Sequence, residues 1–235
     1  MNPMIEKLQH LEKENKKLFC IKLSEKILDN EIIQSQIQIL KNSAIESVCL
    51  ICSHNLQLCL DSAAQYVQAG FCVILETGFH PVFRYGIPAF AQAAAKAGIS
   101  GIRVPDLPFE EQGQLAVYLL DEDGPFLIRE IAPSSGDRIV QNMQFARGFV
   151  WCSNAGNMDF LSQLPGDPLQ FYMYAVEAAA VLPVLIDFGK NSREQLNDYL
   201  DSAAGAIIGS ELIERFERGG YHPAAFGEYC SRFAD

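Results

Sequence analysis

The sequence lacks any apolar run long enough to cross a membrane. Its 235 residues contain no uninterrupted apolar stretch approaching the ~20 residues that a membrane-spanning helix needs. The first segment, residues 1–17, is charged and amphipathic rather than signal-like. We therefore expect no membrane partner and a cytoplasmic location.

Positive charge is also scarce. Eighteen lysines and arginines stand against 29 aspartates and glutamates, which leaves a formal net charge of −11. Such a surface repels a polyanion over most of its area. Nucleic acid is therefore excluded as an expected partner.

The chain shows no linker and no low-complexity stretch, so we predict a single domain over residues 1–235. Short apolar runs alternate with amphipathic segments along its whole length. The predicted strands are 18–23, 47–51, 72–77, 101–104, 126–131, 148–152, 184–188 and 206–208. The predicted helices are 31–41, 56–68, 87–97, 109–120, 138–145, 169–181, 193–203 and 211–218.

Eight strand–helix units predict an α/β fold of the (β/α)8 TIM barrel type. Strands separated by single helices run parallel with right-handed crossovers, and eight of them close most economically as a barrel. An open doubly wound sheet is the alternative, but no glycine-rich dinucleotide fingerprint follows the first strand. Residues 2–16 predict an extra N-terminal helix, which either plugs the bottom of the barrel or lies along its side.

Seven cysteines are scattered through strand-like and helix-like segments, which favours reduced, buried thiols over a disulfide framework. Cys49, Cys52, His54 and Cys59 have roughly the ligand spacing of a zinc site. Cys49 lies in an apolar strand and Cys59 in a helix, where cysteine commonly serves as a small core residue. We therefore predict no metal, with the zinc site as the alternative.

Six motifs then follow one another in a fixed order. They are FHPVFRYG at 79–86, VPDLP at 104–108, IAPSS at 131–135, SNAG at 153–156, FG at 188–189 and GAIIGS at 205–210. In order and spacing this series resembles the tryptophan synthase α subunit family. The resemblance implies cleavage of indole-3-glycerol phosphate to indole and glyceraldehyde 3-phosphate without any cofactor, and transfer of the indole to a β subunit. In the family a glutamate and an aspartate move the protons of this reaction.

Both of these carboxylates are missing at their family positions. By strand alignment Cys49 takes the place of the glutamate, and a thiol with a reference pKa of about 8.5 cannot replace it. Residues 52–70 are largely used by a helix, so no room remains for the long loop that carries the aspartate, and Asp61 falls within that helix. The first strand departs too, with LSEKI at 23–27 in place of the family's TAGDP. We therefore predict a weakly active or inactive subunit that docks on and activates a β-type subunit.

Substitute carboxylates at the carboxyl ends of strands support an alternative, an altered lyase or aldolase. The candidates are Glu76, Asp106 and Asp187. Glu130 also lies at the end of a predicted strand. The competing interpretation is that each is a structural carboxylate paired with Arg103 or Arg129.

A third possibility is a protein that binds a small phosphorylated ligand. The resemblance implies a phosphate site at two helix starts, formed by Gly189, Lys190, Gly209 and Ser210, because unsatisfied helix N–H groups attract anions. Asp159 would oppose such an anion, and the glycines also fit ordinary turns. Trp151 and Gly156 match the ligand pocket, with indole-glycerol phosphate or glyceraldehyde 3-phosphate as the expected ligand.

The loops after the third and fourth strands form the expected docking face for a β subunit. Its residues are Phe79, His80, Pro81, Asp106, Leu107 and Pro108. Phe79 and Leu107 are expected to supply apolar anchors. The simpler interpretation is that the prolines shape two tight turns.

Overall fold

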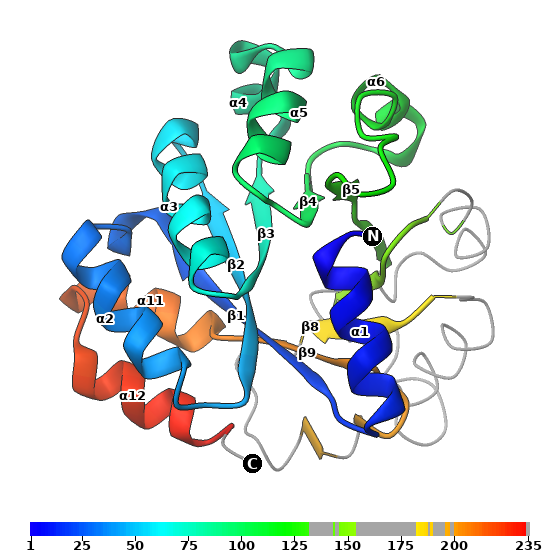
Figure 1. The fold of residues 1–235 in the computed structure, drawn as a ribbon. Helices are drawn as coiled ribbons and strands as arrows, with labels where there is room; N and C mark the ends of the chain where they lie inside the picture. The colour runs from blue at the N-terminus through cyan, green and yellow to red at the C-terminus, as the bar shows by residue number, and fades with distance from the viewer. Residues whose placement is uncertain are drawn as a thin grey trace, which may run out of the picture.

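A computed structural model of the chain describes residues 1–131, 146–153, 182–187 and 200–233, together with positions 143, 189 and 196–197. Figure 1 shows the strands at the centre of the molecule, with helices around their outside. Among the described residues no helix is both long and apolar enough to cross a membrane.

The strands form one parallel sheet in the order β5-β4-β3-β2-β1-β9-β8-β7-β6. Their bounds are β1 Leu18–Ser24, β2 Ile45–Cys52, β3 Cys72–Thr77, β4 Gly101–Arg103, β5 Phe126–Leu127, β6 Arg129–Ile131, β7 Val150–Ser153, β8 Val184–Asp187 and β9 Gly205–Ile208. All eight predicted strands are present.

The two ends of this strand order are joined by the chain itself. Only Ile128 separates β5, which pairs with β4, from β6, which pairs with β7. The Ile128 N–H donates to the carbonyl of Ile102 at 2.8 Å, so the interrupted pair acts as one predicted strand. The sheet thereby curls into a TIM barrel, and the predicted fold class is confirmed.

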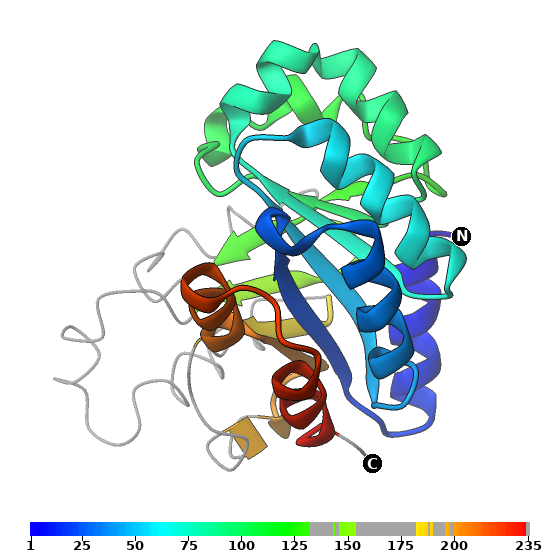
Figure 2. The same ribbon diagram turned by 90° about the vertical axis from the view of Figure 1, so that its left-hand side faces the viewer.

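The helices on the amino-terminal side agree closely with prediction. They are α2 Asn30–Leu40, α3 Leu56–Gln68 and α5 Ile87–Lys96, with the short η1 Glu25–Ile27 after β1. Helix α11, Ser210–Gly219, follows β9. In Figure 2 α2 and α3 face the viewer in front of β1 and β2. The helices predicted at 138–145, 169–181 and 193–203 lie largely outside the described residues.

Three helical segments differ from the prediction. The helix expected at 109–120 is reduced to η2 Phe109–Glu111 and α6 Gly113–Ala116. The motif after β3 forms a helix of its own, α4 Phe79–Tyr85, which tolerates Pro81 in its first turn and ends at Gly86 with φ +91°. Helix α12, Pro223–Ser231, was not predicted; it packs on α2.

Helix α1, Pro3–Lys13, occupies the bottom of the barrel, the first of its two predicted positions. Its Met4, Leu8 and Leu11 share one buried cluster with Leu18, Cys72 and Phe126, which are the first residues of β1, β3 and β5. This cluster is the inner core of the barrel. A second and larger core lies between the strands and the outer helices. Because side chains alternate along a strand, each barrel strand contributes to both cores.

Candidate functional site

Above the inner core, charged side chains fill the upper layer of the barrel interior. Arg103 on β4 donates to Glu76 on β3 at 2.5 Å and to Glu130 on β6 at 2.6 Å. The arginine side chain is 10% exposed, and the two carboxylates are 17% and 29% exposed. One guanidinium therefore links three strands inside a site largely closed to water.

A second ion pair lies across the same layer. Lys22 on β1 donates to Asp187 on β8 at 2.5 Å, and Asp187 also accepts from the Gly189 N–H at 3.3 Å. Trp151 on β7 lies against both cations, with Arg103 Cζ 4.4 Å and Lys22 Nζ 5.3 Å from its ring centroid. Cations over an indole face are attracted by the ring electrons. The two ion pairs of Arg103, the Lys22–Asp187 pair and the indole thus form one connected cluster, which we call the ionic layer.

The ionic layer contains two of the predicted substitute carboxylates and the tryptophan predicted for the ligand pocket. Glu76 and Asp187 are both held by cations; Arg103 was an anticipated partner of such carboxylates, whereas Lys22 was not. Trp151 is fully buried in the inner core beneath these cations, so the described residues do not present its ring to a ligand. Its predicted role in a ligand pocket stays untested, and Gly156 lies outside the described residues.

Cys49 lies in the inner core, as its strand position predicts. It is fully buried, pairs in register with Lys22 and Ile74, and burial raises the pKa of its thiol well above the ordinary value. Strand β2 ends at Cys52 and α3 begins at Leu56, so no long loop separates them. Asp61 lies on the exposed side of α3 and accepts from Gln57 at 2.9 Å.

A cavity of about 320 Å³ opens at the carboxyl ends of β2, β3 and β4. It is lined by Ile51, Cys52, Ser53, Glu76, Thr77, Gly78, Pro81, Pro105 and Asp106. Two of the three candidate carboxylates, Glu76 and Asp106, therefore border the same space. This is the position at which TIM barrels hold their ligands.

Asp106 also joins the two predicted docking loops. Its Oδ1 accepts from the Phe79 N–H at 2.8 Å, at the start of α4. His80, Asp106 and Pro108 are exposed, and Phe79 is half-buried. The expectation for Leu107 was wrong, because this side chain is only 4% exposed and packs in the outer core. On α4, Phe83 is 64% exposed and lies against Phe79.

The predicted phosphate residues sit at tightly built turns. Gly209 has φ +101°, and a Cβ there would lie 3.1 Å from the carbonyl of Lys22, so glycine is required. Its N–H donates to the Tyr229 hydroxyl at 2.9 Å, and the Gly189 N–H is likewise engaged by Asp187. Ser210 begins α11, while Lys190 lies outside the described residues. The phosphate site stays a prediction.

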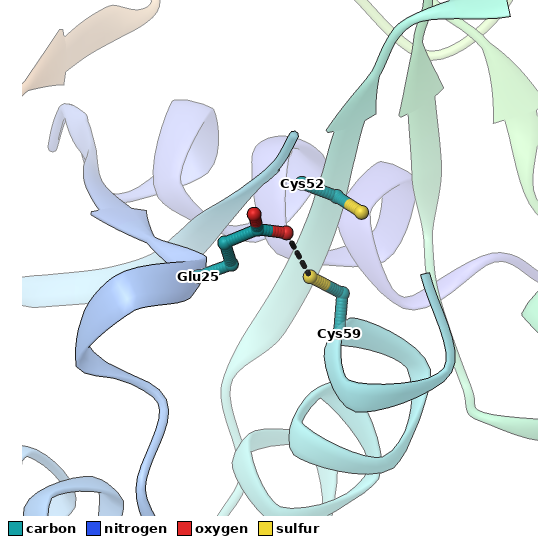
Figure 3. A group of neighbouring side chains, drawn as sticks. All are labelled: Glu25, Cys52 and Cys59. Carbon is teal, nitrogen blue, oxygen red and sulfur yellow. Dashed lines mark hydrogen bonds between the residues drawn. The ribbon is translucent and has the colours of Figure 1, made fainter. Parts of the chain in front are cut away.

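One group of reactive side chains at the mouth was only partly foreseen. Glu25, Cys52 and Cys59 bring their carboxylate and sulfur atoms together (Figure 3). His54 borders the same carboxylate. Cys49 belonged only to the alternative zinc interpretation, and it lies apart from this group. It is three positions before Cys52 on β2, so the alternation of the strand sends Cys49 into the inner core and Cys52 into the outer one. Glu25 was missed because it comes from the preceding strand unit.

Parallel strands closed into a barrel, with a cavity at their carboxyl ends, define an α/β barrel protein of the architecture that commonly holds small-molecule sites. The family model of the tryptophan synthase alpha chain matches residues 24–227. The chain belongs to this family.

Individual relatives agree with this assignment. The tryptophan synthase alpha chain of Lachnospira eligens is 30% identical over 162 residues, which cover 68% of this chain and 61% of the relative. That of Alkaliphilus metalliredigens is 34% identical over 142 residues, which cover 60% and 53%. The matched segment thus spans less than two thirds of the length of either relative.

Solved structures show the same fold over nearly the whole chain. The crystal structure of tryptophan synthase subunit alpha from Legionella pneumophila superimposes with a TM-score of 0.83 at 22% identity, covering 99% of this chain and 97% of the other. A chain of tryptophan synthase from M. tuberculosis gives a TM-score of 0.84 at 20% identity, covering 99% and 97%.

Proposed function

We propose that this chain is an α-type subunit in tryptophan biosynthesis with little or no lyase activity of its own, which docks on and activates a β-type subunit. The observation that carries the proposal is β2. This strand presents a fully buried thiol, Cys49, where the family resemblance places a glutamate, and it runs into α3 after three residues. A buried thiol whose pKa is raised cannot exchange protons near neutral pH as a carboxylate can.

The test of inactivity is direct. Purified protein is given indole-3-glycerol phosphate, and indole release is followed with an active α subunit as reference. Losing one acid or base group typically slows a reaction by about 10²- to 10⁴-fold, so with both missing we expect release near background. Release at the rate of the reference would refute the proposal.

An altered lyase is the second candidate, favoured by the shared cavity of Glu76 and Asp106. If slow release is measurable, Asp106→Asn should reduce it at least tenfold, whereas Asp61→Asn on the outer helix should not change it.

A phosphorylated ligand is a third possibility. Glycerol 3-phosphate at millimolar concentration should then raise the melting temperature, because a ligand that binds only the folded state stabilises it.

The docking part of the proposal rests on the joined loops after β3 and β4. Their exposed residues His80 and Pro108 lie on either side of the hydrogen bond from Phe79 to Asp106. The double variant His80→Glu/Pro108→Glu should lose co-purification with the β chain and its stimulation, because unpaired charges inside an interface are unfavourable.

The control carries two added negative charges elsewhere. Gln9→Glu on α1 and Gln38→Glu on α2 are exposed and far from these loops in sequence. This control should bind the β chain normally, and both variants should keep the melting temperature of the parent. If both double variants bind the β chain as tightly as the parent does, these loops are not the docking face.

A further inference from the structure

Three metal-ligating side chains from three different elements converge at the rim of the barrel. Glu25 comes from η1, Cys52 is the last residue of β2, and Cys59 lies in the first turn of α3. One carboxylate oxygen and the two sulfur atoms all lie within 4.8 Å of one another (Figure 3). Cys59 is fully buried, Cys52 is 3% exposed, and the Glu25 side chain is 9% exposed. A buried carboxylate beside two thiols is not a solvated surface cluster.

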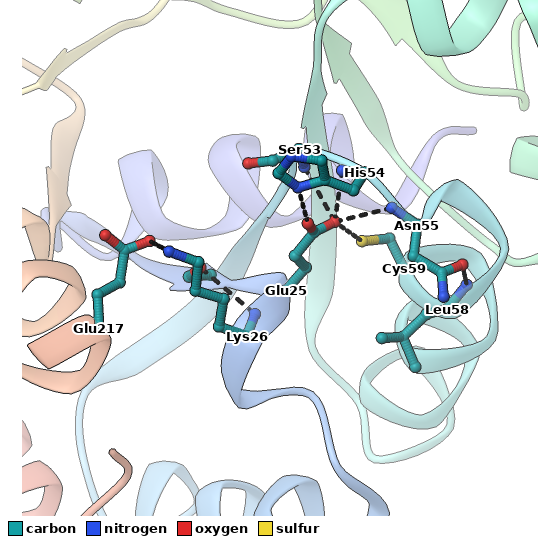
Figure 4. Close-up of polar contacts among 9 residues, drawn as sticks. Glu25, Lys26, Ser53, His54, Asn55, Leu58, Cys59 and Glu217 are labelled. Atoms are coloured by element: carbon teal, nitrogen blue, oxygen red, sulfur yellow. Dashed lines mark hydrogen bonds and ion pairs between the residues drawn. The ribbon is translucent and has the colours of Figure 1, made fainter. Parts of the chain in front are cut away.

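The carboxylate is fixed in place by its surroundings (Figure 4). Glu25 Oε2 accepts the backbone N–H groups of Ser53, His54 and Asn55 at 3.0, 2.9 and 3.1 Å. The other oxygen, Oε1, lies 2.8 Å from His54 Nδ1. Burial alone would raise the pKa of this carboxyl, but these hydrogen bonds outweigh it and lower the pKa to about 2. The carboxylate is therefore held in one orientation beside the two sulfur atoms.

The two thiols of this cluster differ from the other cysteines. Cys59 donates toward Glu25 Oε2 at 4.0 Å and also toward Cys52. The hydrogen bond from Cys59 lowers the pKa of the Cys52 thiol and raises that of Cys59 itself. In contrast, burial raises the pKa of Cys20, Cys49, Cys72 and Cys230 above the ordinary value. What marks Cys52 and Cys59 is their position, because their sulfur atoms lie close to each other and to a carboxylate oxygen.

The spacing suits a tetrahedral zinc ion. With Zn–S about 2.3 Å and Zn–O about 2.1 Å, a tetrahedral ion places a sulfur and an oxygen ligand roughly 3.6 Å apart and two sulfurs roughly 3.8 Å apart. The Cys59 Sγ to Glu25 Oε2 distance is 4.0 Å, and no ligand pair exceeds 4.8 Å. Because the carboxylate is held in place, small rotations of the Cys52 and Cys59 side chains would have to close the remaining difference.

We propose that Cys52, Cys59 and Glu25 bind a divalent thiophilic cation, Zn²⁺, at the rim of the barrel beside the mouth cavity. Both thiols lose their protons to solvent on binding, so two thiolates and one carboxylate surround the dication and leave a net charge of −1. Water takes the fourth position, and His54 positions the carboxylate from outside. Thiolate ligands select zinc over magnesium or calcium, which prefer oxygen.

The test uses Co²⁺ as a spectroscopic probe on full-length protein that has been reduced and stripped with EDTA. We expect one equivalent of Co²⁺ to produce thiolate-to-cobalt charge-transfer bands and the visible bands of a tetrahedral ion. About two protons should be released per metal ion at a pH where both thiols start protonated. One equivalent of Zn²⁺ should then bleach these bands.

Matched variants assign the ligands. Cys52→Ser and Cys59→Ser should each weaken binding at least 100-fold, and Cys230→Ser, another buried thiol, should bind as the parent does. Glu25→Gln keeps a hydrogen-bond acceptor for the backbone N–H groups but removes the anionic ligand, and it should weaken binding at least tenfold. His54→Ala should retain the charge-transfer bands and lose about 10- to 100-fold in affinity, as expected for a residue that orients a ligand.

Two outcomes would overturn the site. One is the absence of charge-transfer bands at equimolar Co²⁺ in protein whose melting temperature and tryptophan fluorescence are those of the folded chain. The other is bands that persist in Cys52→Ser/Cys59→Ser, which would assign the metal to other thiols. If the first outcome is accompanied by a Cys52–Cys59 disulfide formed in air, the pair is a redox couple instead of a metal site.

Discussion

The lower and upper halves of the barrel interior are built from the same strands but by opposite chemistry. At the bottom, Met4, Leu18, Phe126 and Leu185 form an apolar core that α1 closes. At the top, the ionic layer of Arg103, Glu76, Glu130, Lys22 and Asp187 rests on Trp151. Apolar burial stabilises a fold without requiring particular partners. Buried charges are tolerated only when each one keeps its oppositely charged partner. The upper half should therefore be the more sensitive to single changes.

The largest expected effect comes from removing the centre of the ionic layer. Arg103→Leu leaves Glu76 and Glu130 without their common cation, and breaking a buried pair in this way costs about 3–5 kcal/mol. Urea unfolding followed by fluorescence measures it, because Trp151 is the only tryptophan of the chain and lies against Arg103.

A triple variant shows whether charge or volume is responsible. Arg103→Leu/Glu76→Leu/Glu130→Leu removes the whole charged set, and replacing a buried ionic set with apolar residues is often neutral. We expect it to recover most of the lost stability. If the single and triple variants were equally unstable, the contrast between the two halves would reflect packing rather than charge.

The pH dependence of stability extends this comparison to Glu25 at the rim of the barrel. The pKa of Glu25 is lowered in the folded chain to about 2 from its ordinary 4.5, so its contribution is fully present above about pH 4.5. That contribution fades as the pH falls from about 4.5 through 2, and the shift, discounted for solvent screening at the rim, corresponds to roughly 2–3 kcal/mol at neutral pH.

The measurement is the difference in unfolding free energy between the parent and Glu25→Gln, in EDTA, from pH 7 to pH 2. We expect the parent to be the more stable at pH 7 and the difference to vanish near pH 2. The exposed Glu12→Gln on α1 should show a small and nearly constant difference. A difference for Glu25→Gln that does not change with pH would contradict the role of its charge.

The two halves also differ in how far the sequence predicts them. The eight strands and several outer helices follow from alternating apolar and amphipathic segments, since these patterns are local. Arg103 was named, with Arg129, as one of two possible partners for Glu76, but the sequence did not choose between them. Lys22 with Asp187 joins residues 165 positions apart in sequence, and only the closure of the barrel brings β1 next to the final strands.

The group of Glu25, Cys52 and Cys59 at the rim also shows how far the sequence alone predicts a site. The spacing of Cys52 and Cys59 is local and was noticed as an alternative, and the alternation of side chains along β2 separates Cys49 from them. Glu25 could be found only once β1 and β2 were known to be neighbours in parallel register. Leu107 was misjudged because a motif in a loop does not reveal which of its side chains turns inward.

The smallest expected effect tests the lower half, where one polar residue closes the apolar core. Asn2 is fully buried, and its amide donates to the carbonyls of Ser100 at 2.9 Å and Gly124 at 2.8 Å, while its Oδ1 caps α1 by accepting from the Met4 N–H at 3.0 Å. Asn2→Ala leaves these backbone groups unsatisfied and should cost about 1–3 kcal/mol of unfolding free energy.

Asn42→Ala is the matched control, since Asn42 is exposed and donates to the Gln38 carbonyl at 2.9 Å. It should change the unfolding free energy by less than about 0.5 kcal/mol. Because the apolar contacts of Met4, Leu8 and Leu11 remain, the loss for Asn2→Ala should stay below that for Arg103→Leu. A larger loss for Asn2→Ala would mean that the attachment of α1, rather than the ionic layer, is the most sensitive part of the barrel interior.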